Sequence, residues 1–254
     1  MKQSSLMSFL LALALLVACA LGCNRSAGLE TKEDNANKKA TQADKPPADI
    51  AGDYEVTGSN ENGSPYKGTL AVIKHGEVYQ FRWNAGKQYD GVGVPNGNVV
   101  AVAFTGGANG KGCGVVSYQM LDDGTLDGKW GYWGVNESGT ERATRNGGGS
   151  GLIGSYDITG TNPSGAGYKG TMAVDSKGGG YTFVWSNGST GYGLKHGNTV
   201  NVGIGGSRCA FMAYDVKSNG TLDGVWASFG SDHTGKELAT KKQSVGSSPQ
   251  SSDK

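Results

Sequence analysis

The sequence predicts an all-β protein that contains two tandem, up-and-down antiparallel β-barrels of about eight strands each. Three observations point to this fold class: glycine accounts for 45 of the 254 residues, apolar side chains recur with a period of two, and most of the chain is written twice. A period of two is typical of strands with one buried face. β-Sandwiches are the alternative, but closed barrels are favoured because they leave no strand edge exposed.

Residues 1–23 have the pattern of an export signal. Residues 6–17 form an almost unbroken apolar run, which is too short to span a membrane but has the length of a signal core. The run leads into small residues and two cysteines, Cys19 and Cys23, and each surrounding segment resembles the lipidation site of a bacterial lipoprotein. We therefore expect an exported lipoprotein that faces the periplasm or the cell surface; ordinary secretion is the alternative.

Two polar segments flank the repeated part of the chain. Residues 24–47 are rich in Lys, Glu, Asp, Asn and Ala and end in two prolines, and residues 243–254 are rich in serine. Neither segment carries enough apolar surface to offset the entropy lost on folding. We expect the first to be a flexible tether and the second a disordered tail.

The body consists of one unit that occurs twice, at residues 48–145 and 152–242, joined by a glycine-rich linker at 146–151. The segment GDYEVTG at 52–58 reappears as GSYDITG at 154–160, and GTLDG occurs at both 124–128 and 220–224. The offset between the copies falls from 102 to 96 along the chain, and each change lies in a glycine-rich stretch, where loops tolerate insertions. We expect each copy to close its own barrel.

Alternating apolar residues mark the strands of each copy in order. In the first copy the expected inward sets are Tyr54 and Val56; Tyr66, Leu70 and Val72; Tyr79, Phe81 and Trp83; Val100, Val102 and Phe104; Val116, Tyr118 and Met120; Leu126 and Trp130; and a last strand at 140–145. Turn signals separate them: Asp123-Gly124, Asn219-Gly220, Asn96-Gly97 and His196-Gly197 suit hairpins that need a positive φ.

This pattern resembles the calycin class, the barrels of avidins and lipocalins, in its number of strands and in its tryptophan-containing strands. The duplicated Gly-x-Tyr-x-(Val/Ile)-x-Gly and Tyr-x-Gly-Thr segments also resemble those of exported bacterial proteins that are loosely labelled fibronectin-binding. The first resemblance implies a closed barrel, and the second implies a surface adhesin.

The aromatic residues of the expected inward faces have two interpretations. They fill the barrels as a packed core, which we expect, or they line a ligand cavity, which is the alternative for an eight-stranded barrel. The candidates are Tyr79, Phe81, Trp83, Trp130, Tyr181, Phe183, Trp185 and Trp226. Inward glycines such as Gly68, Gly91, Gly93 and Gly128 are expected to make room for neighbouring rings.

Few residues suggest catalysis or metal binding. Glu141 and Glu237 are equivalent and have inward parity; we expect them to form strand-end ion pairs with Lys or Arg, with a catalytic carboxylate as the alternative. Asp127 and Asp223 are expected to stabilise bends. The three histidines, His75, His196 and His233, have no counterparts and are expected on the surface. We predict no enzyme activity, no metal site and no cofactor.

Cys113 and Cys209 are equivalent residues, one in each copy. Export permits a disulfide. We expect two free, partly buried thiols, and a disulfide formed where the two copies meet is the alternative.

Charge and duplication bear on the partners. A formal net charge of +1 with no basic segment argues against nucleic-acid binding. We expect a membrane-tethered binding or adhesion module that contacts an extracellular protein through its loops and through outward rings such as Trp133 and Phe229. A carrier of small apolar or polar ligands in the barrel interior is the alternative, followed by an envelope inhibitor or a structural lipoprotein.

Overall fold

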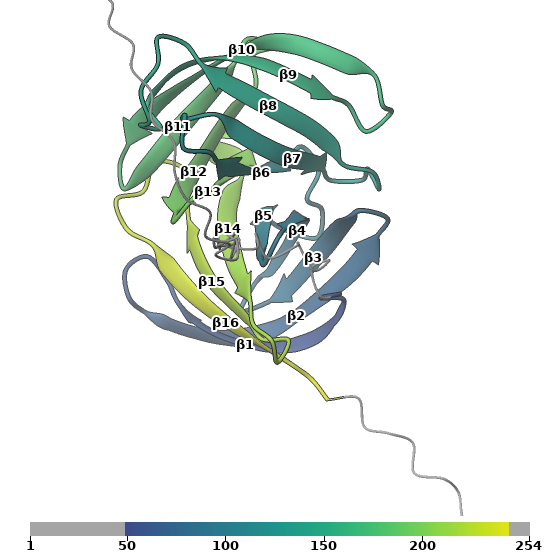
Figure 1. The fold of residues 1–254 in the computed structure, drawn as a ribbon. Coiled ribbons are helices and arrows are strands. Elements are labelled where there is room, and N and C mark those ends of the chain that lie inside the picture. Colours follow the sequence, from purple (N-terminus) through teal and green to yellow (C-terminus); the bar gives the residue numbers. More distant parts are fainter. Residues whose placement is uncertain (1–48, 244–254) are drawn as a thin grey trace, which may run out of the picture. The chain divides into compact units, whose positions relative to one another are not determined.

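Figure 1 shows the computed structural model of the chain, which describes residues 49–243. The predicted signal peptide, Cys19, Cys23, the predicted tether and residues 244–254 of the predicted tail lie outside the described residues. Within those residues, no helix has the length and apolar character needed to cross a membrane.

Each repeat forms eight strands, as its alternation predicts. Those of the first repeat are β1 (Gly52–Ser59), β2 (Pro65–His75), β3 (Val78–Asn84), β4 (Gln88–Asn96), β5 (Val99–Gly106), β6 (Gly114–Met120), β7 (Leu126–Tyr132) and β8 (Gly139–Arg145). Those of the second are β9 (Gly154–Thr161), β10 (Gly167–Lys177), β11 (Gly180–Trp185), β12 (Thr190–His196), β13 (Thr199–Ile204), β14 (Ala210–Val216), β15 (Leu222–Ala227) and β16 (Gly235–Lys241), with the short 3₁₀ turn η1 (Gly206–Arg208) before β14.

The strands close into two antiparallel barrels, which confirms the predicted fold class, but the two repeats exchange strands. The first barrel runs β1-β16-β15-β14-β5-β4-β3-β2, and the second runs β10-β11-β12-β13-β6-β7-β8-β9. In Figure 1 the yellow-green strands β14–β16 from the end of the chain accordingly lie with the blue strands β1–β5. The barrels therefore differ from the expected division, in which residues 48–145 and 152–242 each closed one barrel.

The exchange replaces one hydrogen-bonded partner with an equivalent one. In the first barrel Val100 of β5 lies opposite Tyr214 of β14. In the second barrel Val200 of β13 lies opposite Tyr118 of β6. Because β6 and β14 occupy equivalent positions in the two repeats, either strand satisfies the open edge of a five-stranded sheet. Which of these two strands pairs with β5 and which with β13 depends on the path of the chain after β5 and after β13.

Each barrel has its own apolar core, and a third cluster lies between the barrels. Phe81 and Phe183 are fully buried in the cores of the first and second barrels. The third cluster contains residues from the outer faces of both barrels: Val78, Val92, Val94, Ala101, Ala103, Cys113, Val115 and Cys209. Strand β5 is consequently buried on both faces, which explains its unbroken apolar run from Val99 to Phe104.

Cys113 and Cys209 form a disulfide with an S–S distance of 2.00 Å, so the expected free thiols are not present. Cys113 directly precedes β6 and Cys209 directly precedes β14, which are the first strands after the chain has passed from one barrel to the other. The strand exchange brings these two crossover segments together, and both cysteines are buried in the cluster between the barrels.

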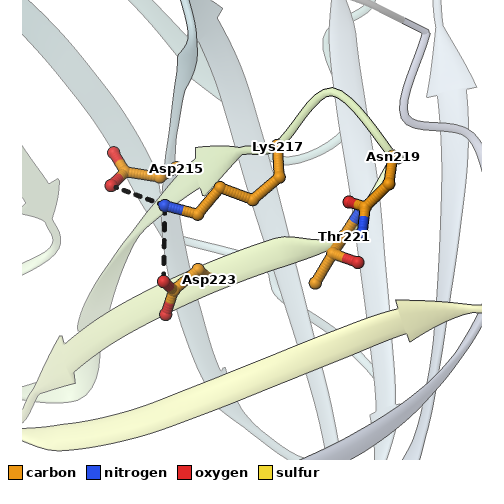
Figure 2. Close-up of polar contacts among 5 residues, drawn as sticks. All are labelled: Asp215, Lys217, Asn219, Thr221 and Asp223. Carbon is orange, nitrogen blue, oxygen red and sulfur yellow. Dashed lines mark hydrogen bonds and ion pairs between the residues drawn. The ribbon is translucent and has the colours of Figure 1, made fainter.

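The predicted hairpin turns are confirmed by their backbone. Gly97, Gly124, Gly197 and Gly220 have φ values of 59°, 80°, 56° and 81°. In the β14–β15 hairpin the N–H of Thr221 donates to Asn219 Oδ1 at 3.0 Å. Figure 2 shows this turn with an ion-paired lysine beside it: Lys217 Nζ lies 3.4 Å from Oδ2 of both Asp215 and Asp223.

Asp127, the equivalent of Asp223, pairs with Arg142 at 3.6 Å. Both aspartates therefore take part in exposed ion pairs, which contribute only about 0–1 kcal/mol each. The histidines His75, His196 and His233 are exposed, as predicted.

Candidate functional site

Each barrel contains one buried glutamate, Glu237 on β16 of the first and Glu141 on β8 of the second. Their exposed fractions are 3% and 5%. Within the described part of the chain, neither carboxylate forms the expected ion pair with a Lys or Arg. The partners are instead neutral hydroxyl and indole donors from inside the same barrel.

In the first barrel three side chains donate to the Glu237 carboxylate. Trp83 Nε1 donates to Oε1 at 2.9 Å, and the hydroxyl of Tyr66 donates to Oε2 at 2.9 Å. The hydroxyl of Tyr214 donates to Oε1 as well. The donors come from β3, β2 and β14, so the site needs strands of both repeats.

The second barrel repeats this arrangement with equivalent residues. Trp185 Nε1 donates to Glu141 Oε1 at 2.9 Å, and the hydroxyl of Tyr168 donates to Oε2 at 2.9 Å. The hydroxyl of Tyr118 completes the set on Oε1. A network that occurs in both barrels is a property of the repeated unit.

The register of the strands explains how two tyrosines reach one glutamate. In the first barrel Tyr66, Gly58, Glu237, Gly224 and Tyr214 lie directly opposite one another across five adjacent strands. Directly opposite residues share a face of the sheet. We call this arrangement the Tyr-Gly-Glu-Gly-Tyr row.

The second barrel has the same row, formed by Tyr168, Gly160, Glu141, Gly128 and Tyr118.

The glycines of the row leave the space through which the tyrosine rings cross. A Cβ at Gly224 would lie 2.7 Å from the ring of Tyr214, and one at Gly128 would lie 2.4 Å from the ring of Tyr118. Such distances are too short for carbon atoms in contact. The inward glycine Gly128 thus makes room for a ring, as predicted, and that ring is then able to bind the carboxylate.

Burial controls the protonation of these groups. Desolvation raises the pKa of Glu237, and the hydrogen bonds from Tyr214, Trp83 and Tyr66 partly offset this rise. Desolvation, followed by the nearby glutamate, also raises the pKa of Tyr118 and Tyr214 well above the usual value. The tyrosine hydroxyls therefore remain protonated and act as donors.

In each barrel a cavity is lined by the glutamate and at least one tyrosine of the row. The first cavity, in the first barrel, has a volume of about 560 Å³ and is lined by Glu237, Tyr66, Trp83 and Trp226 and by residues of the loops at that end of the barrel. The second cavity, in the second barrel, has a volume of about 240 Å³ and is lined by the equivalent residues Glu141, Tyr168, Trp185 and Trp130. Sites for small molecules commonly measure about 300–1,000 Å³.

One indole in each cavity has an unsatisfied polar atom. The Nε1 atoms of Trp130 and Trp226 are buried and have no hydrogen-bond partner among the described residues. A buried donor without a partner costs about 1–3 kcal/mol. The two indoles lie at equivalent positions, against Gly139 of the second barrel and Gly235 of the first.

The predicted aromatic set divides into two groups. Four tryptophans, Trp83, Trp130, Trp185 and Trp226, line the two cavities. The other four candidates pack against the cores instead: Tyr79, Phe81, Tyr181 and Phe183. The barrel interior therefore contains both a packed core and a cavity.

The rings expected to face outward pack within the described structure. Trp133 packs against the cluster between the barrels, and Phe229 packs against Tyr192 with ring centroids 5.5 Å apart. This packing leaves the cavities as the better-supported candidate for a binding site.

Sequence reasoning placed Glu141 and Glu237 on inward faces but missed the donors that gather around them. The repeated glycines at 58, 128, 160 and 224 were a signal, because a strand glycine marks a close approach. Among the described residues, no cluster of His, Cys, Asp and Glu is arranged to hold a metal ion.

Comparisons of the chain with protein-family models, with curated proteins and with solved structures give no match. The geometry of the two cavities is therefore what indicates a function.

Proposed function

We propose that this protein is an exported, membrane-tethered binding protein that takes small molecules into the cavities of its two barrels without catalysing a reaction. The observation that carries the proposal is the Tyr-Gly-Glu-Gly-Tyr row, which lies beneath a cavity in both barrels. A buried carboxylate with oriented donors is costly to maintain if it serves packing alone.

The chemistry of the lining indicates the kind of ligand. An ionised carboxylate offers about four acceptor positions, and three donors approach each glutamate. One acceptor position therefore remains for a ligand N–H or O–H. A small molecule with an apolar body and an N–H or O–H donor fits this requirement.

Two features favour binding over catalysis. The raised pKa values of Tyr118 and Tyr214 keep the hydroxyls protonated, so they do not act as bases near neutral pH. Each glutamate oxygen already accepts at least one hydrogen bond from its barrel, so both oxygens are engaged within the site before a ligand enters. We therefore propose a carrier or sensor.

The test combines native mass spectrometry with a fluorescent probe. We expect untagged protein to retain a co-purified small molecule, and we expect the stripped protein to bind phenylnaphthylamine, an aromatic amine with one N–H donor. Trp83→Phe keeps a ring but removes the indole donor to Glu237, and it should weaken probe binding by about tenfold. Trp133→Phe, outside both cavities, is the matched control. Protein that carries no small molecule and does not bind the probe would contradict the proposal.

The membrane tether rests on the sequence of residues 1–23. Cys19 and Cys23 are each replaced with alanine. The variant that lacks the lipidated cysteine should leave the membrane fraction, and the other variant should remain in it. Retention of both single variants and of the double variant in the membrane fraction would argue against a lipid anchor.

A further inference from the structure

The two cavities differ in ways that follow from single positions in the repeats. Tyr132 lines the second cavity, and its ring packs edge-on against Trp130 with centroids 5.7 Å apart. The equivalent position in the second repeat is Ser228, which lines the first cavity. A serine in place of a tyrosine leaves the first cavity larger, at about 560 Å³ against about 240 Å³.

The first cavity is also more aromatic. Tyr89 of β4 and Phe104 of β5 line it, where the second cavity has Ser189 and Ile204. Phe104 contacts Trp83 at 5.4 Å, and Tyr89 and Trp226 at 6.1 Å each, measured between ring centroids. These rings form a continuous aromatic wall, and such walls accept planar aromatic groups by offset and edge-to-face contacts.

Two cations lie at the loops around the first cavity. Lys87, between β3 and β4, and Arg208, at the end of η1, both line it and are exposed to solvent. Position 112, the equivalent of 208 in the first repeat, is a glycine. The loop between β11 and β12, which corresponds to the loop of Lys87, lines the second cavity with Ser186, Asn187 and Ser189 and contributes no cation. The second cavity has one cation in its lining, Lys169.

Arg208 directly precedes the disulfide-bonded Cys209, and a Cβ added at Gly112 would lie 3.2 Å from its Nη1 atom. The nearby carboxylate of Glu61 accepts from the backbone N–H and hydroxyl of Ser228, at 2.6 and 3.0 Å, and does not line the cavity. Among residues 49–243, Glu237 is therefore the one acidic residue in the lining of the first cavity.

We infer that the first cavity takes an aromatic ligand that carries an acidic group, with the acid at Lys87 and Arg208 and an N–H or O–H donor at Glu237. The second cavity takes a smaller ligand and does not select for an acidic group. This inference rests on the proposed binding function and adds the class of ligand and the difference between the two barrels. Arginine and lysine at the edge of an aromatic site are suited to carboxylates, sulfonates and phosphates.

The experiment compares two probes that share an aromatic body and an N–H donor. Anilinonaphthalene sulfonate carries an acidic group, and phenylnaphthylamine does not. We expect the full-length protein to bind one equivalent of the sulfonate, more tightly than the neutral amine at the same site. The variants Lys87→Gln and Arg208→Gln should each weaken sulfonate binding by about fivefold and leave binding of the neutral amine unchanged. Lys169→Gln, at the second cavity, is the matched control.

A second pair of variants assigns the site to one barrel. Ser228→Tyr places in the first cavity the ring that fills the second, and it should abolish binding of the sulfonate. Tyr132→Ser makes the reciprocal change and should enlarge the second cavity enough to bind the neutral amine. Equal affinity for both probes with no effect of Arg208→Gln would overturn the inference while leaving the proposed function intact. Failure of both probes to bind any variant would overturn both.

Discussion

Tyr66 and Glu237 lie two strands apart in the first barrel, yet they are joined by a 2.9 Å hydrogen bond because the residue between them is Gly58. A tyrosine ring is long enough to cross one strand only when no side chain stands in its way. On the other side of Glu237, Gly224 plays the same part for Tyr214. The glutamate site therefore depends on the lack of side chains at Gly58 and Gly224 as well as on the hydrogen-bond donors.

Gly224→Ala should therefore destabilise the protein, although alanine is normally better than glycine in a strand. The new Cβ would lie 2.7 Å from the Tyr214 ring, and we expect the free energy of unfolding to fall by about 1–3 kcal/mol. Denaturant unfolding measures the change. Gly151→Ala is the control, since nothing lies within 4 Å of its Cβ position. Equal stability of the two variants would contradict the role of the row.

The disulfide makes a second prediction. It joins residues separated by 96 positions and lies where both crossover segments meet. Replacing Cys113 and Cys209 with serine should lower the free energy of unfolding by about 2–5 kcal/mol, because the unfolded chain regains the freedom of a large loop. Thermal unfolding with and without reductant gives the same comparison in the parent protein. A reductant-insensitive transition in the parent would count against it.

Strand exchange makes the two repeats interdependent. A protease site introduced at residues 147–149, which are exposed, should allow the chain to be cut between the repeats. We expect the two fragments to remain together on size-exclusion chromatography even after reduction, because each barrel needs strands of both. Separation into two folded barrels would show that each repeat closes on its own.

Burial of Glu237 makes stability depend on pH at the acidic end. Its pKa is raised above the usual 4.5 in the folded protein, so the folded state binds this proton more readily than the unfolded state. The contribution of Glu237 to the free energy of unfolding is greatest below about pH 4.5 and is lost as the pH rises through the pKa of the folded state. The difference in unfolding free energy between the parent and Glu237→Gln should therefore decrease with rising pH in this window. A difference that is independent of pH would contradict it.

The buried tyrosines predict a loss of stability at the alkaline end. Burial raises the pKa of Tyr54 to about 12, and it raises the pKa of Tyr118 and Tyr214 well above the usual value of 10. The unfolded state releases these protons from about pH 10, so stability should fall as the pH rises above that value. Tyrosinate absorbance should appear together with unfolding. Ionisation of all tyrosines in the folded protein near pH 10 is the outcome that would rule this out.

The sequence predicted separate residues of the site but not how they come together. The parity of Glu141 and Glu237 placed them inside, and the tryptophans were recognised as core or ligand residues. The expected ion pairs were wrong because the partners of each glutamate come from three other strands, and their meeting depends on register. The size of each cavity depends on side chains such as Tyr132 and Ser228, which continue the inward alternation of Trp130 and Trp226 but were not singled out in the sequence.

The strands, the turns and the duplication follow from the amino-acid sequence alone, since alternation and glycine conformations are local properties of a few neighbouring residues. The sequence does not indicate which strands complete which barrel, because β6 and β14 present the same pattern to β5 and to β13. Tertiary packing selects the pairing, through the burial of both faces of β5 and the disulfide between Cys113 and Cys209. Packing between elements far apart in the chain selects one of two locally equivalent pairings, and the position of the candidate sites follows from that selection.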